Sequence, residues 1–175
     1  MLSELNSWQL PLLHTLEINS YARRPRDIVI PPLHTLFGGA LNLEHLVLRL
    51  EVDQFLSHLV FPNLTTFELL MRLGERFRVS DLLDFLKTSP LLRTVKVDIF
   101  DGDVMESAPQ GMVVALPNVE TFSLSVRGYC QTYLYDIAVH VACPFVKRAS
   151  LTHEVEGSHF RFMEHNCSPV YNQPS

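Results

Sequence analysis

The stretch PNVETFSL, residues 117–124, places apolar side chains at its third, sixth and eighth positions, directly behind a proline. The same phrase, Pro-x-L-x-x-L-x-L with L standing for an apolar residue, recurs along the chain, and Leu41 replaces the proline in one copy. The copies cover residues 11–18, 41–48, 62–69, 90–97, 117–124 and 144–151. Because successive copies start 21 to 30 residues apart, the chain is an array of one repeated unit.

Repeats of about 20 to 29 residues that contain L-x-x-L-x-L are typical of leucine-rich repeats. The last two apolar positions of each phrase lie two residues apart, so they share one face of a strand. Parallel strands need a return connection, and the segments between the phrases are long enough to provide one. The sequence therefore predicts an α/β leucine-rich-repeat solenoid, with a curved parallel sheet on the concave side and short helices and irregular segments on the convex side.

The clearest return segment lies before residue 90. Ser80 is predicted to cap a helix, Asp81 favours its first turn, three leucines within 82–86 share a face, and Ser89-Pro90 ends it. Residues 133–141 are compatible with a short helix or a strand.

Composition and length favour a single globular domain, with 47% hydrophobic residues, 19% charged residues and a net charge of −5. We expect about six repeats over residues 1–157 and a polar, poorly ordered C-terminal tail over residues 158–175. The acidic balance argues against a nucleic-acid or anionic-membrane binder, and no apolar run is long enough to span a bilayer.

The three cysteines, Cys130, Cys143 and Cys167, form an odd set without C-x-x-C spacing, which is typical of reduced thiols rather than of a disulfide framework. The N-terminus lacks the basic and apolar regions of a signal peptide. We therefore expect an intracellular protein, cytoplasmic or nuclear, that is monomeric.

Catalytic motifs such as G-x-S-x-G and the phosphate-binding glycine loops are absent from the sequence. His153, His159 and His165, with Glu154 and Cys167 nearby, could in principle ligate zinc, but their six-residue spacings match no common ligand motif. We therefore expect that the chain is not an enzyme and that it has neither a metal site nor a cofactor.

The candidate binding surface consists of the strand residues that point away from the apolar face. The first outward column, just before the second apolar position, contains Thr15, His45, Thr66, Thr94, Thr121 and Arg148. The second outward column, between the second and third apolar positions, contains Glu17, Val47, Glu68, Lys96, Ser123 and Ser150. Two alternatives to binding stay open. Threonine favours exposed strand positions through its β-propensity whether or not a partner binds, and Glu68 and Lys96 could simply pair across adjacent strands.

Charged residues at the ends of the strands alternate in sign. Basic residues follow the first and third phrases, at Arg23, Arg24, Arg26, Arg72, Arg76 and Arg78. Acidic residues follow the second and fourth phrases, at Glu51, Asp53, Asp98, Asp101, Asp103 and Glu106. Neighbouring repeats lie about 5 Å apart at the strands, so we expect this rim to pair with itself and to offer no nucleic-acid site.

The phrases LPLLHTLEI, ALNLEHLVLRL, FPNLTTFEL and TSPLLRTVKV resemble the leucine-rich region of fungal F-box proteins, particularly the large basidiomycete family, over roughly residues 8 to 155. That resemblance implies a ubiquitin-ligase subunit in which an N-terminal F-box docks onto the ligase core and the repeats present a substrate. No F-box precedes Pro11 in this sequence. The asparagine of the longer L-x-x-L-x-L-x-x-N-x-L repeat is also missing, so no asparagine ladder is expected.

The predicted function is a protein-binding leucine-rich-repeat module, the substrate-recognition part of an F-box-type adaptor, with a protein partner and neither nucleic acid nor membrane. The alternative is a truncated repeat remnant that has no independent activity or competes with full-length relatives. Both ends of the array look unfinished, so a fragment, an incomplete gene model or a short paralogue that has lost its neighbouring module is expected.

Overall fold

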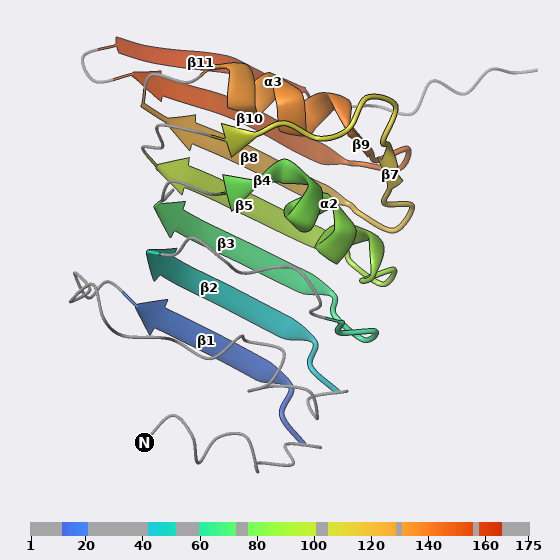
Figure 1. Ribbon diagram of the computed structural model, residues 1–175. Helices are drawn as coiled ribbons and strands as arrows, with labels where there is room; N and C mark the ends of the chain where they lie inside the picture. Colours follow the sequence, from blue (N-terminus) through green and yellow to red (C-terminus); the bar gives the residue numbers. More distant parts are fainter. Residues whose placement is uncertain are drawn as a thin grey trace, which may run out of the picture.

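The computed structural model describes the backbone of residues 12–20, 42–51, 60–72, 77–100, 105–128, 131–155 and 158–165. Its main feature is a seven-stranded sheet in which the strands lie side by side in chain order (Figure 1). The strands are β1 (Thr15–Ser20), β2 (His45–Glu51), β3 (Thr66–Arg72), β5 (Thr94–Phe100), β8 (Thr121–Arg127), β10 (Arg148–Val155) and β11 (Ser158–His165). The first six are parallel, and each comes from one copy of the repeated phrase.

The six parallel strands are aligned without any shift between equivalent positions. One inward column consists of Leu16, Leu46, Phe67, Val95, Phe122 and Ala149, and the next of Ile18, Leu48, Leu69, Val97, Leu124 and Leu151. From Leu46 to Phe122 the first of these columns is buried. Since a shift of one residue would turn every side chain to the opposite face, this common register is what gathers the apolar set on one side.

The proline of the phrase lies at the second position of a β-turn. In four copies the carbonyl before the proline accepts a hydrogen bond from the N–H three residues later. These bonds join Phe61 to Leu64 (3.1 Å), Ser89 to Leu92 (3.3 Å), Leu116 to Val119 (3.3 Å) and Cys143 to Val146 (3.3 Å). Proline suits this turn position because its fixed φ is the one that the turn requires.

Each turn is tied to the next by a shared backbone carbonyl. The carbonyl of Glu120 accepts hydrogen bonds from the N–H groups of Lys147 (2.9 Å) and Arg148 (3.0 Å), and the carbonyl of Arg93 does the same for Glu120 (2.8 Å) and Thr121 (3.0 Å). Equivalent pairs of bonds reach the carbonyls of His14, Glu44 and Thr65. All six parallel strands therefore begin at the same level.

Two helices, α2 (Val79–Lys87) and α3 (Gln131–Val139), lie on the same side of the sheet (Figure 1). Two short parallel pairs accompany them, β4 (Phe77–Arg78) with β6 (Met105–Glu106) and β7 (Val114–Ala115) with β9 (Val141–Ala142). The sequence predicted a short helix or a strand over residues 133–141, and the structure forms the helix as far as Val139.

The start of α2 differs from the prediction, because Arg78 and not Ser80 is the N-cap residue and makes no side-chain capping bond. The pairing of β4 with β6 keeps Arg78 extended, and the helix begins directly after it with the fully buried Val79. The predicted C-terminal end is confirmed, since the Thr88 hydroxyl donates to the carbonyl of Phe85 at 2.8 Å and the turn at Ser89 follows.

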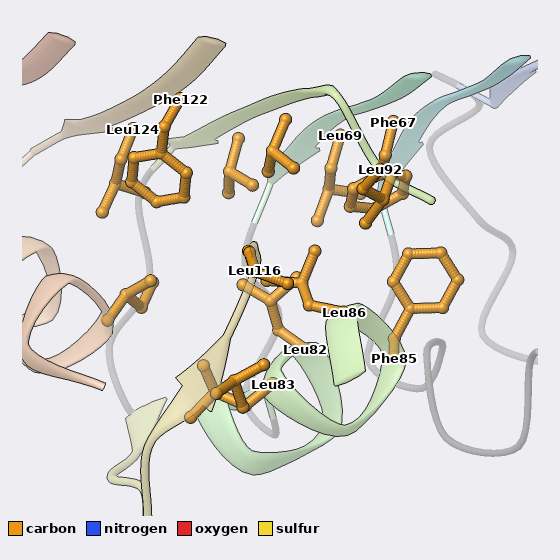
Figure 2. Close-up of a cluster of buried hydrophobic side chains, with 14 of the residues drawn as sticks. Phe67, Leu69, Leu82, Leu83, Phe85, Leu86, Leu92, Leu116, Phe122 and Leu124 are labelled. Carbon is orange, nitrogen blue, oxygen red and sulfur yellow. The ribbon is translucent and has the colours of Figure 1, made fainter. Parts of the chain in front are cut away.

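The core lies between the inward face of the sheet and α2 (Figure 2). Leu82, Leu83 and Leu86 of the helix are at most 1% exposed. Each leucine buried to this degree stabilises the fold by about 1.5–3 kcal/mol relative to an exposed one.

β11 is antiparallel to β10 and forms the end of the sheet, with an irregularity in the pairing at Ser150 and Leu151. The sequence prediction of a polar, poorly ordered tail from residue 158 did not include this strand. The alternation of Phe160 and Phe162 with polar neighbours was its local signal. Residues 166–175 of the predicted tail lie outside the described residues.

Candidate protein-binding face

The twelve residues predicted to form the binding surface all lie in the six parallel strands. The first outward column runs in register from Thr15 on β1 to Arg148 on β10, and the second from Glu17 to Ser150. All twelve side chains are exposed or half-buried, whereas their neighbours in β2, β3, β5 and β8 at the inward positions are buried. The structure therefore brings them together on one face, and binding by that face stays a prediction.

The same face continues beyond the residues that the phrase predicted. A third outward column contains Asn19, Arg49, Leu70, Asp98, Ser125 and Thr152. Beyond it lie Phe100, Arg127 and Glu154 on the last three parallel strands. The phrase ends too early to include them, although the alternation of apolar and polar residues in 95–99 continues and was their signal.

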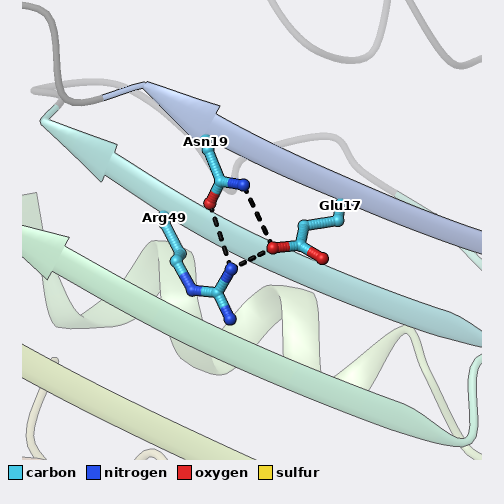
Figure 3. Close-up of polar contacts among 3 residues, drawn as sticks. All are labelled: Glu17, Asn19 and Arg49. Carbon is cyan, nitrogen blue, oxygen red and sulfur yellow. Dashed lines mark hydrogen bonds and ion pairs between the residues drawn. The ribbon is translucent and has the colours of Figure 1, made fainter.

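A first polar cluster joins β1 to β2 (Figure 3). The Asn19 amide donates to a Glu17 carboxylate oxygen at 3.0 Å, and the Arg49 guanidinium donates to the Asn19 side-chain oxygen at 3.1 Å and to Glu17. These contacts, with the Asn19 bond the largest, hold the pKa of Glu17 below its usual value. The cluster holds Glu17 and Arg49 together as an ion pair on the outward face.

Glu68 and Lys96 form a second pair, from β3 to β5. The Lys96 Nζ lies 2.6 Å from a Glu68 carboxylate oxygen, which confirms the alternative that these two residues pair across the strands. Exposed pairs of this kind contribute about 0.2–1 kcal/mol. The pair therefore helps to align neighbouring strands and is less available to a partner than two isolated charges would be.

Arg127 is the centre of a third cluster. Its guanidinium donates to Asp98 at 2.9 Å, lies 3.3 Å from a Glu154 oxygen and stacks over the Phe100 ring, 4.3 Å from the centroid. Burial raises the pKa of Asp98, and the nearby Arg127 charge opposes that shift. Asp98 was predicted in a loop on the self-paired rim. It lies within β5 and pairs with a cation of the adjacent strand β8.

The other predicted rim residues are less well defined. Arg78 belongs to β4 and Glu106 to β6, while the side chains of Glu51, Arg72 and Glu106 are not described. The remaining predicted rim residues, Arg23, Arg24, Arg26, Asp53, Arg76, Asp101 and Asp103, lie outside the described residues.

Side chains also connect the repeats at the edge where the strands begin. His14 Nδ1 lies 3.2 Å from Glu44, and Lys147 Nζ lies 2.8 Å from Glu120. The Asn118 amide donates to the carbonyl of Pro90 in the preceding turn, at 2.9 Å. The asparagine ladder discussed above would lie after each strand. Asn118 instead bridges two repeats from the turn before β8, and the sequence pattern did not predict this hydrogen bond.

The histidines and cysteines that the sequence analysis considered as metal ligands or thiols can be placed in part. In the part of the chain that the structure describes, no group of three or more His, Cys, Asp or Glu residues is placed to hold a metal. His153 is 5% exposed in an inward position, and its Nε2 donates to the Gly128 carbonyl at 3.1 Å. Burial raises the pKa of the Cys143 thiol to about 11, which makes it a poor nucleophile. The side chains of His159 and His165 and the whole of Cys167 are outside the described set.

Comparisons of the chain with protein-family models, with curated proteins and with solved structures found no match. None of the helices in the described ranges is long and apolar enough to cross a membrane. Because the comparisons supply no function, the assignment depends on the outward face, which lies opposite the side that carries α2 and α3 (Figure 1).

Proposed function

We propose that this chain is a protein-binding leucine-rich-repeat module whose six parallel strands form the concave sheet of a solenoid. The observation that carries the proposal is the common register of the outward columns from β1 to β10. A repeat array of this type needs to bury only one face of its sheet, and the opposite face is then an extended surface for a partner.

The chemistry of the outward face favours a protein as that partner. Six strands spaced about 4.8 Å apart make the face roughly 24 Å wide, which suits a folded surface or a peptide. Its charges alternate in sign and are largely paired across neighbouring strands, as at Glu68 with Lys96 and Asp98 with Arg127. A face with such mixed charge sets the orientation and association rate of a charged partner more than its affinity.

We further propose that the module recognises the substrate of an F-box-type ubiquitin-ligase adaptor and acts as a monomer in the cytoplasm or nucleus. The resemblance of the repeated phrases to fungal F-box proteins supports this role. Overexpression of the chain should change the half-life of its partner in a proteasome-dependent manner. A partner whose half-life is unaffected by the chain would contradict the ligase role and leave protein binding intact.

The binding proposal is tested by site-specific photo-crosslinking in cells. A benzophenone amino acid is placed at Ser123 or Ser150, two uncharged positions of the second outward column, or at Asp84, which is exposed on α2 on the opposite side. The same partner should be crosslinked from Ser123 and Ser150 and not from Asp84. Crosslinks from Asp84 alone, or none from the two serines, would reject the outward columns as the interface.

A further inference from the structure

Three cations surround one carboxylate at the edge where β5, β8 and β10 begin. The exposed side chains of Arg93, Lys147 and Arg148 come from two repeats that flank Glu120 of the repeat between them. The backbone bonds from Glu120 N–H to the Arg93 carbonyl (2.8 Å) and from Lys147 N–H to the Glu120 carbonyl (2.9 Å) hold these repeats in contact. The grouping therefore follows from the fold and not from long, freely placed side chains.

The charges in this group do not cancel. Glu120 forms an ion pair with Lys147 at 2.8 Å. The hydrogen bond from Lys147, followed by the charges of Lys147, Arg93 and Arg148, holds the pKa of Glu120 below its usual value. Among the described residues, Arg93 and Arg148 form no ion pair with another carboxylate, and both act on the charge of Glu120. This edge is thus locally cationic on a chain whose net charge is −5.

Exposed apolar side chains lie on the same edge. Leu91 is 46% exposed and Phe145 is 71% exposed. Each lies at the third position of a β-turn, two residues before a cation of the group. Asn118 occupies the equivalent turn position between them and bonds back to the Pro90 carbonyl at 2.9 Å. Two exposed apolar residues therefore lie in the turns that precede the cations, and Asn118 bridges the turn between them.

We propose that this basic edge, formed by Leu91, Arg93, Phe145, Lys147 and Arg148, docks an acidic peptide segment of the protein partner that carries apolar side chains among its carboxylates. The proposal rests on the proposed function, since it names the chemistry of one part of that partner. Guanidinium groups bind carboxylates through paired hydrogen bonds, and exposed aromatic residues beside them are typical anchors of an interface. Arg93 and Arg148 are two repeats apart, roughly 10 Å, which about three residues of an extended peptide can span.

A peptide partner fits this edge better than a nucleic acid does. Nucleic-acid sites extend along many phosphates and give a basic surface as a whole, whereas the described cations of this edge, Arg93, Lys147 and Arg148, lie within three repeats of a chain that is acidic overall. The neighbouring Leu91 and Phe145 give the edge an apolar component that a carboxylate-rich peptide with apolar residues would use.

The test measures fluorescence anisotropy with a labelled peptide, EEFEELEE, and its neutral counterpart, QQFQQLQQ, at low and high salt. The acidic peptide should bind at least tenfold more tightly than the neutral one, and its affinity should fall as salt rises. The double variant R93Q/R148Q should weaken binding at least fivefold, and F145S should weaken it as well. Arg78→Gln is the matched control, because the exposed Arg78 lies in β4 directly before α2 and outside the six parallel strands, and it should change affinity less than twofold.

Equal binding of the two peptides, or full affinity in R93Q/R148Q, would overturn the inference. A single-stranded oligonucleotide that competes as well as the acidic peptide would also overturn it, because the edge would then be a general anion surface. If R93Q/R148Q fails to fold, the comparison of the two peptides and of KKFKKLKK on the native chain decides the question. Unchanged crosslinking from Ser123 in a folded R93Q/R148Q variant would reject this edge and leave the proposed function standing. If Ser123 gives no crosslink in the native chain, the proposed function itself is rejected.

Discussion

The ring of Phe85 on α2 lies against the ring of Phe67 on β3, with their centroids 4.6 Å apart and their planes tilted by 50°. Both side chains are at most 1% exposed, so this contact joins the helix to the centre of the sheet. Tilted aromatic pairs at this distance contribute about 0.5–1.5 kcal/mol beyond the burial of their area.

Replacing Phe85 by alanine should therefore lower the free energy of unfolding by about 3–5 kcal/mol, because the change removes the ring contact and leaves a cavity under α2. Urea unfolding followed by circular dichroism measures the effect. Asp84→Ala, on the exposed side of the same helix, is the control and should change stability by less than about 0.5 kcal/mol. A loss below about 1 kcal/mol at Phe85 would mean that α2 is not packed on the sheet as described.

Ser89→Ala should stabilise the protein. Ser89 is fully buried, and its hydroxyl oxygen has no hydrogen-bond partner among the described residues. Removing a buried polar group without a partner is expected to gain about 1 kcal/mol, read as a higher unfolding temperature. Ser123→Ala, at a half-buried outward position, is the comparison and should be nearly neutral. A clear loss of stability in Ser89→Ala would show that the hydroxyl has a partner in the folded protein.

Glu17 and Asp98 should respond to pH in opposite directions. The pKa of Glu17 is lowered, so its contribution to stability is present above the unfolded pKa and is lost as pH falls through the folded one. The pKa of Asp98 is raised by burial, so its contribution is full below the unfolded pKa and is lost as pH rises through the folded one.

Relative to wild type, Glu17→Gln should thus lower Tm more at about pH 7 than at about pH 3, whereas Asp98→Asn should become comparatively more stable as the pH rises. Thermal unfolding at several pH values, at constant ionic strength, compares the two variants. Parallel pH profiles of the wild type and Asp98→Asn would contradict the burial of this carboxylate.

The Glu68 and Lys96 pair can be tested by exchanging its charges. The single variant Lys96→Glu should destabilise the sheet because it places two carboxylates opposite each other, while the double variant E68K/K96E should restore most of the loss. A double-mutant cycle with neutral replacements should give a coupling free energy of about 0.2–1 kcal/mol. Additive effects of the two neutral replacements would mean that the pair does not form in solution.

β11 is expected to protect the last parallel strand. A chain truncated after residue 157 loses the antiparallel partner of β10 and exposes the unpaired edge of that strand. Analytical ultracentrifugation should find the full chain monomeric and the truncated chain associated. A truncated chain that stays monomeric at the same concentration would show that β11 has no such role.

The parallel order of the strands and the two outward columns could be predicted because a fixed apolar spacing recurs in six phrases. The same spacing puts Leu124 inward and Ser123 outward, and the register carries this choice from strand to strand. β11 could not be predicted in this way, since it is antiparallel, follows no proline turn and repeats nothing. Its place in the sheet depends on pairing with β10, which is a contact between segments rather than a local pattern.

The helix start and the third outward column were missed for a different reason. Arg78 is extended because β4 pairs with β6, a long-range constraint that overrides the capping preference of Ser80. Asp98 was assigned to a loop because the phrase ends at Val97, although β5 continues to Phe100. The contacts of Arg127 with Asp98 and Glu154 then depend on three strands whose alignment only the folded sheet determines.

The shared carbonyls at the start of the strands make the array tolerant of length changes in one region and intolerant in another. Successive phrases begin 21 to 30 residues apart, yet each parallel strand after β1 begins at the level set by the carbonyl before the preceding strand. An inserted residue in a return segment therefore lengthens a connection and leaves the sheet unchanged. A residue inserted between Val119 and Leu124 would instead exchange the buried and outward sides of β8, so natural variation in repeat length is expected to accumulate almost entirely outside the phrases.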